Sequence, residues 1–136
     1  MIEATARAAA YVAGRLVTAQ HAGAMVDRVS GVRWRFAGDV QADRVALTDL
    51  ETSCLITGRA VAHGPLWLFH QDTMRHLTLT TQPGGTFTGL DYSTGHTFDV
   101  LAGGDGIVEL LDHDTGRRRR YQLQLAPALA SSSTSP

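Results

Sequence analysis

The sequence predicts a mainly β fold, in which five β-hairpin repeats form an antiparallel meander that rolls into a barrel or sandwich, with one N-terminal α-helix packed inside or across it. Three observations lead to this prediction. A turn motif recurs every 21 or 22 residues, apolar residues alternate with others on both sides of each turn, and an alanine-rich segment without proline precedes the first repeat.

The first predicted element is a helix over residues 2–20. This segment is rich in strong helix formers and contains no proline. Ala4, Ala8 and Val12 fall near one stripe of such a helix, and Leu16 extends its apolar side. The many alanines make the helix thin, so it can approach other backbones closely.

The repeated turn is clearest at residues 91–95 and 112–116, which both read Asp-x-x-Thr-Gly and lie 21 residues apart. An aspartate that starts such a turn accepts hydrogen bonds from backbone N–H groups two and three residues later, and the final glycine tolerates a left-handed backbone. Met74 replaces this glycine in the third copy, so that turn should differ or be strained. The first turn position holds Asp27, Asp49, His70, Asp91 and Asp112, and the hydroxyl three residues later belongs to Ser30, Thr52, Thr73, Thr94 and Thr115.

Apolar residues two apart flank every turn, which is the spacing of strands with one buried face. The column two residues before the turn holds Met25, Leu47, Leu68, Gly89 and Leu110, and the column four residues before it holds Gly23, Val45, Leu66, Phe87 and Val108. After the turn, the columns hold Trp34, Ile56, Leu77, Phe98 and Arg119, then Phe36, Gly58, Leu79, Val100 and Tyr121. The five hairpins therefore predict about ten strands over residues 24–125.

A sheet of this size has to hide its edges, so we expect it to close or to fold over. A barrel of about ten strands is wider than side chains alone can fill, and a thin helix suits its interior. The alternative is a β-hairpin solenoid capped by the helix. Residues 1–125 are predicted to form a single domain, and the tail over residues 126–136 is predicted to be disordered toward its end.

The composition excludes several classes of protein. The chain carries 12 basic and 13 acidic residues, so its net charge of −1 gives no general attraction to nucleic acid, which is not an expected partner. No apolar run approaches the roughly 20 residues of a membrane span. Glu3 and Arg7 interrupt the apolar N-terminal segment, so no signal peptide is predicted. The default location is cytoplasmic, and export without a signal peptide stays open.

No catalytic residue, cofactor or metal site is predicted. The six histidines include no pair at the spacing of a helical metal site, and the one cysteine rules out an intramolecular disulfide. His96 and His113 lie on adjacent repeats near the turn end and could approach each other, but solvated loop histidines are the favoured interpretation. Cys54 is interpreted as a small buried thiol, because no activating base can be inferred for it.

Arginines form the strongest local charge feature. The four consecutive arginines must point alternately to the two faces of a strand, which puts Arg119 in an apolar column. Arg119 then marks the edge of the core, a buried ion pair or an anion site, and the favoured interpretation of the run is a protected edge strand. If the barrel closes, the first and last hairpins meet, and these residues become one anion-binding or partner-binding patch: Arg33, Arg35, Arg117, Arg118, Arg119 and Arg120.

Trp67 and Phe69 lie on the face opposite Leu66 and Leu68, so both faces of that strand are apolar. This pattern indicates an apolar contact, and we favour coverage by the helix or self-association.

The sequence favours a non-enzymatic binding or self-assembly module over an enzyme. The repeated hairpins expose equivalent turns, which suits multivalent binding to a second copy of the chain or to an acidic polymer or glycan. The alternative is a small enzyme or ligand carrier with its site at a barrel mouth. The inward columns are nearly all apolar, which argues against chemistry inside.

Overall fold

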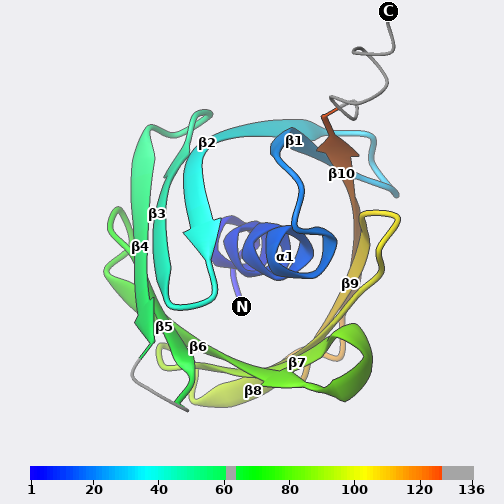
Figure 1. The fold of residues 1–136 in the computed structure, drawn as a ribbon. Helices are drawn as coiled ribbons and strands as arrows, with labels where there is room; N and C mark the ends of the chain where they lie inside the picture. The colour runs from blue at the N-terminus through cyan, green and yellow to red at the C-terminus, as the bar shows by residue number, and fades with distance from the viewer. Residues whose placement is uncertain (61–63, 127–136) are drawn as a thin grey trace, which may run out of the picture.

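The computed structural model describes residues 1–60 and 64–126 as a closed antiparallel barrel of ten strands around one helix. Figure 1 views the barrel along the helix, which lies inside the ring of strands. The predicted barrel with an internal helix is confirmed. The solenoid alternative is wrong, because the strands close into one ring. The predicted disordered tail lies outside the described residues apart from Ala126.

The helix and strands follow one another with short connections (Figure 1). The helix α1 spans Glu3–Thr18, slightly less than the predicted 2–20. The strands are β1 (Ala22–Asp27), β2 (Arg33–Gln41), β3 (Arg44–Asp49), β4 (Cys54–Ala60), β5 (Leu66–His70), β6 (Arg75–Gln82), β7 (Thr86–Asp91), β8 (His96–Ala102), β9 (Ile107–Asp112) and β10 (Arg118–Leu125). A short 3-10 turn, Pro83–Gly85, joins β6 to β7.

Each strand pairs with the strand before and after it, and β1 closes the ring by pairing with β10 as well as with β2. The interpretation of the arginine run as an edge strand is therefore wrong, because β10 has a partner on both sides. Gly23 is exposed although its column predicts burial. The register of β1 against β10 shifts between Ala22 and Ala24, and this irregularity turns Gly23 outward.

The apolar columns fill the barrel interior. Leu47, Ile56 and Leu110 are fully buried, as their alternation predicts. The exception at Gly89 has a packing reason, because the ring of Phe98 occupies the space that a side chain at Gly89 would fill. Both Ser53 and Met74 have positive φ in their turns, so the third turn keeps the left-handed conformation without glycine.

The helix is buried over its first three turns, and its residues from Thr5 to Gly14 are hidden from solvent. Its small side chains allow close approach, and the ring of Tyr11 stacks on Phe36 with centroids 4.2 Å apart. A Cβ at Gly14 would lie 2.7 Å from a methyl of Leu123 on β10. The helix packs most extensively against β9 and β8. It therefore lies off the barrel axis. Within the described residues, no helix is long and apolar enough to cross a membrane.

Candidate functional site

The barrel has two unlike ends. The five hairpin turns gather at the end where α1 begins, which we call the turn end. The connections between hairpins gather where α1 finishes, which we call the connector end. The turn end holds buried charges, and the connector end holds a mostly apolar cavity.

The turn aspartates use their two carboxylate oxygens differently. One oxygen, Oδ1, accepts a backbone N–H two residues later, as in Asp27 with Val29 at 2.8 Å and Asp112 with Asp114 at 3.0 Å. The other oxygen of Asp49 faces the interior, where Arg7 of the helix donates to it from two nitrogens at 2.8 Å. The turn aspartates thus close their hairpins, and Asp49 and Asp112 also supply negative charge near the start of the helix.

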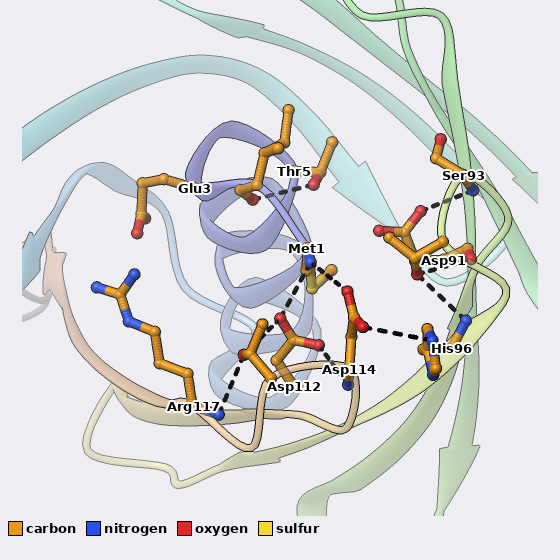
Figure 2. A network of polar contacts seen from close by, with 12 residues as sticks. Met1, Glu3, Thr5, Asp91, Ser93, His96, Asp112, Asp114 and Arg117 are labelled. Carbon is orange, nitrogen blue, oxygen red and sulfur yellow. Dashed lines mark hydrogen bonds and ion pairs between the residues drawn. The ribbon is translucent and has the colours of Figure 1, made fainter.

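A second charged group surrounds Met1 (Figure 2). The amine of Met1 lies 3.1 Å from Oδ2 of Asp112 and 3.7 Å from Asp114. Arg119 lies 3.5 Å from the same oxygen of Asp112 and 3.3 Å from Glu3. Arg119 therefore forms buried ion pairs, which is one of the three interpretations that the sequence suggested for an arginine in an apolar column.

The electrostatics of this group follow from burial and pairing. Burial by itself raises the pKa of Asp112, but hydrogen bonds from the Met1 amine and from the Asp114 N–H lower the pKa overall. Burial raises the pKa of the Tyr121 hydroxyl, and the neighbouring charge of Glu3, which accepts its hydrogen bond at 2.8 Å, raises it further. The charged form of Asp112 and the neutral form of Tyr121 are thus both favoured beside the start of the helix.

Cys54 and His70 form a buried pair that the sequence analysis did not predict. The sulfur lies 3.5 Å from Nε2 of His70, while Nδ1 lies 2.8 Å from the hydroxyl of Thr73. Burial raises the pKa of the Cys54 thiol and lowers the pKa of His70, and both shifts favour the neutral forms of the two groups. The signal that could have found the pair is the alignment of adjacent repeats, which puts both residues at the same end of neighbouring hairpins.

A cavity of about 620 Å³ lies at the connector end between the last turn of α1 and strands β5, β6 and β7. The helix packs less closely on β5 and β7 than on β8 and β9, which leaves space at this part of the wall. Its described lining is mostly apolar and includes no titratable side chain. The side chains that we use below are Leu16, Val17, Leu66, Leu79, Phe87, Thr81 and Gln82.

The predicted arginine patch is only partly assembled. The first and last hairpins do meet, since β1 lies between β2 and β10. Arg35 pairs with Glu51 at 2.9 Å, Arg120 pairs with Glu109 at 2.8 Å, and Arg118 lies 3.9 Å from Glu109. Arg33 donates to Gln124 at 2.7 Å, and Arg117 is exposed. Most of these guanidinium groups therefore already have a polar partner on the barrel wall.

Trp67 and Phe69 lie on the outer wall of the barrel. The helix is inside, on the face of Leu66 and Leu68, so its predicted coverage of Trp67 and Phe69 is wrong. Trp67 is 42% exposed, and its ring centroid lies 5.2 Å from that of Tyr92.

The loop histidines pair with separate carboxylates. His96 lies 3.3 Å from Asp114, and His113 lies 2.8 Å from Asp99. In residues 1–60 and 64–126, no group of three or more histidine, cysteine or acidic side chains is arranged to hold a metal ion.

Comparisons of the chain with protein-family models, curated proteins and solved structures find no match.

Proposed function

We propose that this protein binds a small, largely apolar molecule in the cavity at the connector end, as a carrier or sensor of that molecule. The observation that supports the proposal most directly is the cavity of about 620 Å³. Small-molecule sites are typically concave, mostly apolar and roughly 300–1,000 Å³ in volume. Its position agrees with the alternative function suggested by the sequence, a small enzyme or ligand carrier with its site at a barrel mouth.

The lining indicates the chemistry of the ligand. Leu16 and Val17 from the helix face Leu79 and Phe87 from the barrel wall, which suits a hydrocarbon or aromatic body. Polar groups from Thr81 and Gln82 lie on β6 at the rim and can bond a hydroxyl or carbonyl. The ligand that fits best has an apolar body with one polar end.

The same lining favours binding over catalysis. None of the cavity's described side chains is a histidine, cysteine, lysine, arginine or carboxylate. General acid–base or nucleophilic catalysis needs such a group within reach of the ligand. The charged residues of the interior lie at the opposite end of the helix.

Titration with the neutral fluorescent probe N-phenyl-1-naphthylamine tests the proposal. We expect enhanced, saturable fluorescence with the wild-type protein. Val17→Trp fills the cavity and should weaken the binding of the probe roughly tenfold or more, which corresponds to about 1.4 kcal/mol of binding free energy. The matched control is Val29→Trp, since Val29 is 85% exposed at the turn end. Absence of saturable binding, or equal binding by both variants, would overturn the proposal.

A binding module that acts through the outer wall is the second candidate. The exposed aromatic residues around Trp67 favour it, and they belong to a separate site.

A further inference from the structure

A shallow groove of about 460 Å³ crosses the outer face of β3, β4 and β5. Its outward side chains form a basic half on β3 and β4 and an aromatic half on β5 and β6, and Ala46 lies on β3 opposite Thr57. The basic half and its floor comprise Arg44, Arg59 and Thr57, and the aromatic half comprises Trp67, Phe69 and His76. The groove is separate from the barrel-mouth cavity, and the two share no lining residue.

The basic half places two like charges side by side. Arg44 lies directly opposite Arg59 in the register of β3 and β4, and both are exposed. Like charges at opposed positions of an antiparallel pair repel each other. Among the described residues, neither guanidinium has a carboxylate within ion-pair distance, whereas Arg35 and Arg120 each have one. An anion bound between Arg44 and Arg59 would remove this repulsion.

The aromatic half lies next to the basic half. Trp67 is directly opposite Arg59 in the register of β4 and β5. Phe69 packs on the ring of His76 with centroids 4.7 Å apart, and Tyr92 lies beside Trp67. A cluster of aromatic rings therefore begins one strand away from Arg59.

We infer that this groove binds an acidic oligosaccharide built from hexuronate units. A sugar carboxylate matches the forked donors of the guanidinium groups. The apolar face of a sugar ring suits the exposed indole of Trp67, while its hydroxyls can bond Thr57 and His76. A long nucleic acid fits less well, because two arginines and a net charge of −1 give little counterion release or long-range attraction.

The two tryptophans provide a direct readout. Trp34 is half-buried beside Arg7, whose guanidinium lies 5.1 Å from its ring centroid, so it reports on another part of the barrel. We expect trigalacturonate to shift the NMR signal of the Trp67 indole N–H while that of Trp34 stays in place. The shift should saturate and weaken with added salt. Neutral maltotriose, the control sugar, should shift the Trp67 signal far less.

Variants locate the site. Replacing both exposed arginines (Arg44→Gln with Arg59→Gln) should weaken trigalacturonate roughly tenfold or more, with an unchanged circular dichroism spectrum. Arg117→Gln is the matched control, because Arg117 is exposed near the turn end. Probe binding in the mouth cavity should survive the double substitution, so the two sites succeed or fail separately.

Three results would overturn the inference. The first is an unmoved Trp67 signal in saturating trigalacturonate. The second is equal weakening by Arg117→Gln, which would move binding to the arginines around β10. The third is tighter binding of an oligothymidylate than of trigalacturonate, which would assign the groove to single-stranded nucleic acid.

Discussion

The two ends of the barrel hold the helix by different means. At the turn end, Arg7 meets Asp49, and Arg119 meets Asp112 and Glu3, all within the closed ring. At the connector end, Val17 and the neighbouring wall leave an apolar cavity. The aspartates of the repeat motif thus hold one end of the helix, whereas the described residues form no ion pair with the other end. Substitutions in the cavity at the connector end can therefore leave the ion pairs at the turn end intact.

The largest expected effect comes from the charged anchor. Asp49→Asn keeps the oxygen that accepts the Glu51 N–H at 3.1 Å but removes the charge that faces Arg7. A buried guanidinium without its partner typically costs about 3–5 kcal/mol. We expect the free energy of unfolding, measured by urea denaturation, to fall by that amount.

Asp27→Asn is the matched control for this substitution. Asp27 closes its turn in the same way, and it forms no ion pair among the described residues. We expect a loss of no more than about 0.5 kcal/mol, as for most surface substitutions. Similar losses at both positions would mean that the turn, rather than the charge, carries the effect.

A smaller effect should separate tight from loose packing along the helix. Ala9 is fully buried, so Ala9→Leu forces extra volume into a filled layer and should cost about 1–3 kcal/mol. Val17→Leu extends into the cavity and should change the free energy of unfolding by less than about 0.5 kcal/mol. Thermal and urea denaturation of both variants measure this difference. Equal destabilisation would show that the connector end is as tightly packed as the middle.

The smallest effect concerns pH. Burial lowers the pKa of His70, with Asp72 and Asp49 opposing the shift more weakly. The imidazole of His70 then binds a proton more readily in the unfolded chain than in the folded chain. The contribution of neutral His70 to the free energy of unfolding is therefore present above about pH 6.5, and it is lost as the pH falls toward the lowered pKa of the folded state. His70→Asn should flatten the dependence of unfolding free energy on pH between about pH 7 and pH 5.

His21→Asn, at an exposed position of the connector end, is the matched substitution that leaves His70 in place. Binding of the naphthylamine probe should stay constant over the range in which the wild type remains folded, because no described residue of the cavity titrates. If the affinity of the folded protein for the probe depended on pH, a titrating group would have to act on the cavity at the connector end.

The sequence predicts the fold because its signals are local and repeated. Leu47, Ile56 and Leu110 follow the strand period, and the periodicity leaves a thin helix to fill the ring. The cavity was not predictable in detail, since it depends on the helix lying nearer to β8 and β9 than to β5. Contact between Cys54 and His70 depends on the register between neighbouring hairpins, which periodicity alone does not fix.

The misplaced coverage of Trp67 has a different origin. When both faces of a strand are apolar, the sequence of that strand does not show which face is buried. Only the closure of the barrel decides which face lies inside. Once Leu66 and Leu68 face the helix, Trp67 and Phe69 must face out. The exposed aromatic residues are therefore a consequence of ring closure combined with strand alternation.

The enclosed helix has a consequence for the order of events during synthesis. The ring closes only when β1 meets β10, as in the pairing of Met25 with Leu123. The helix therefore emerges before the strands that enclose it, and until the ring closes its alanine-rich surface is open to water or to a chaperone. Such late, long-range closure predicts slow folding for the size of the protein. It also predicts that the amides of the buried stretch from Ala6 to Gly14 exchange with solvent through opening of the ring.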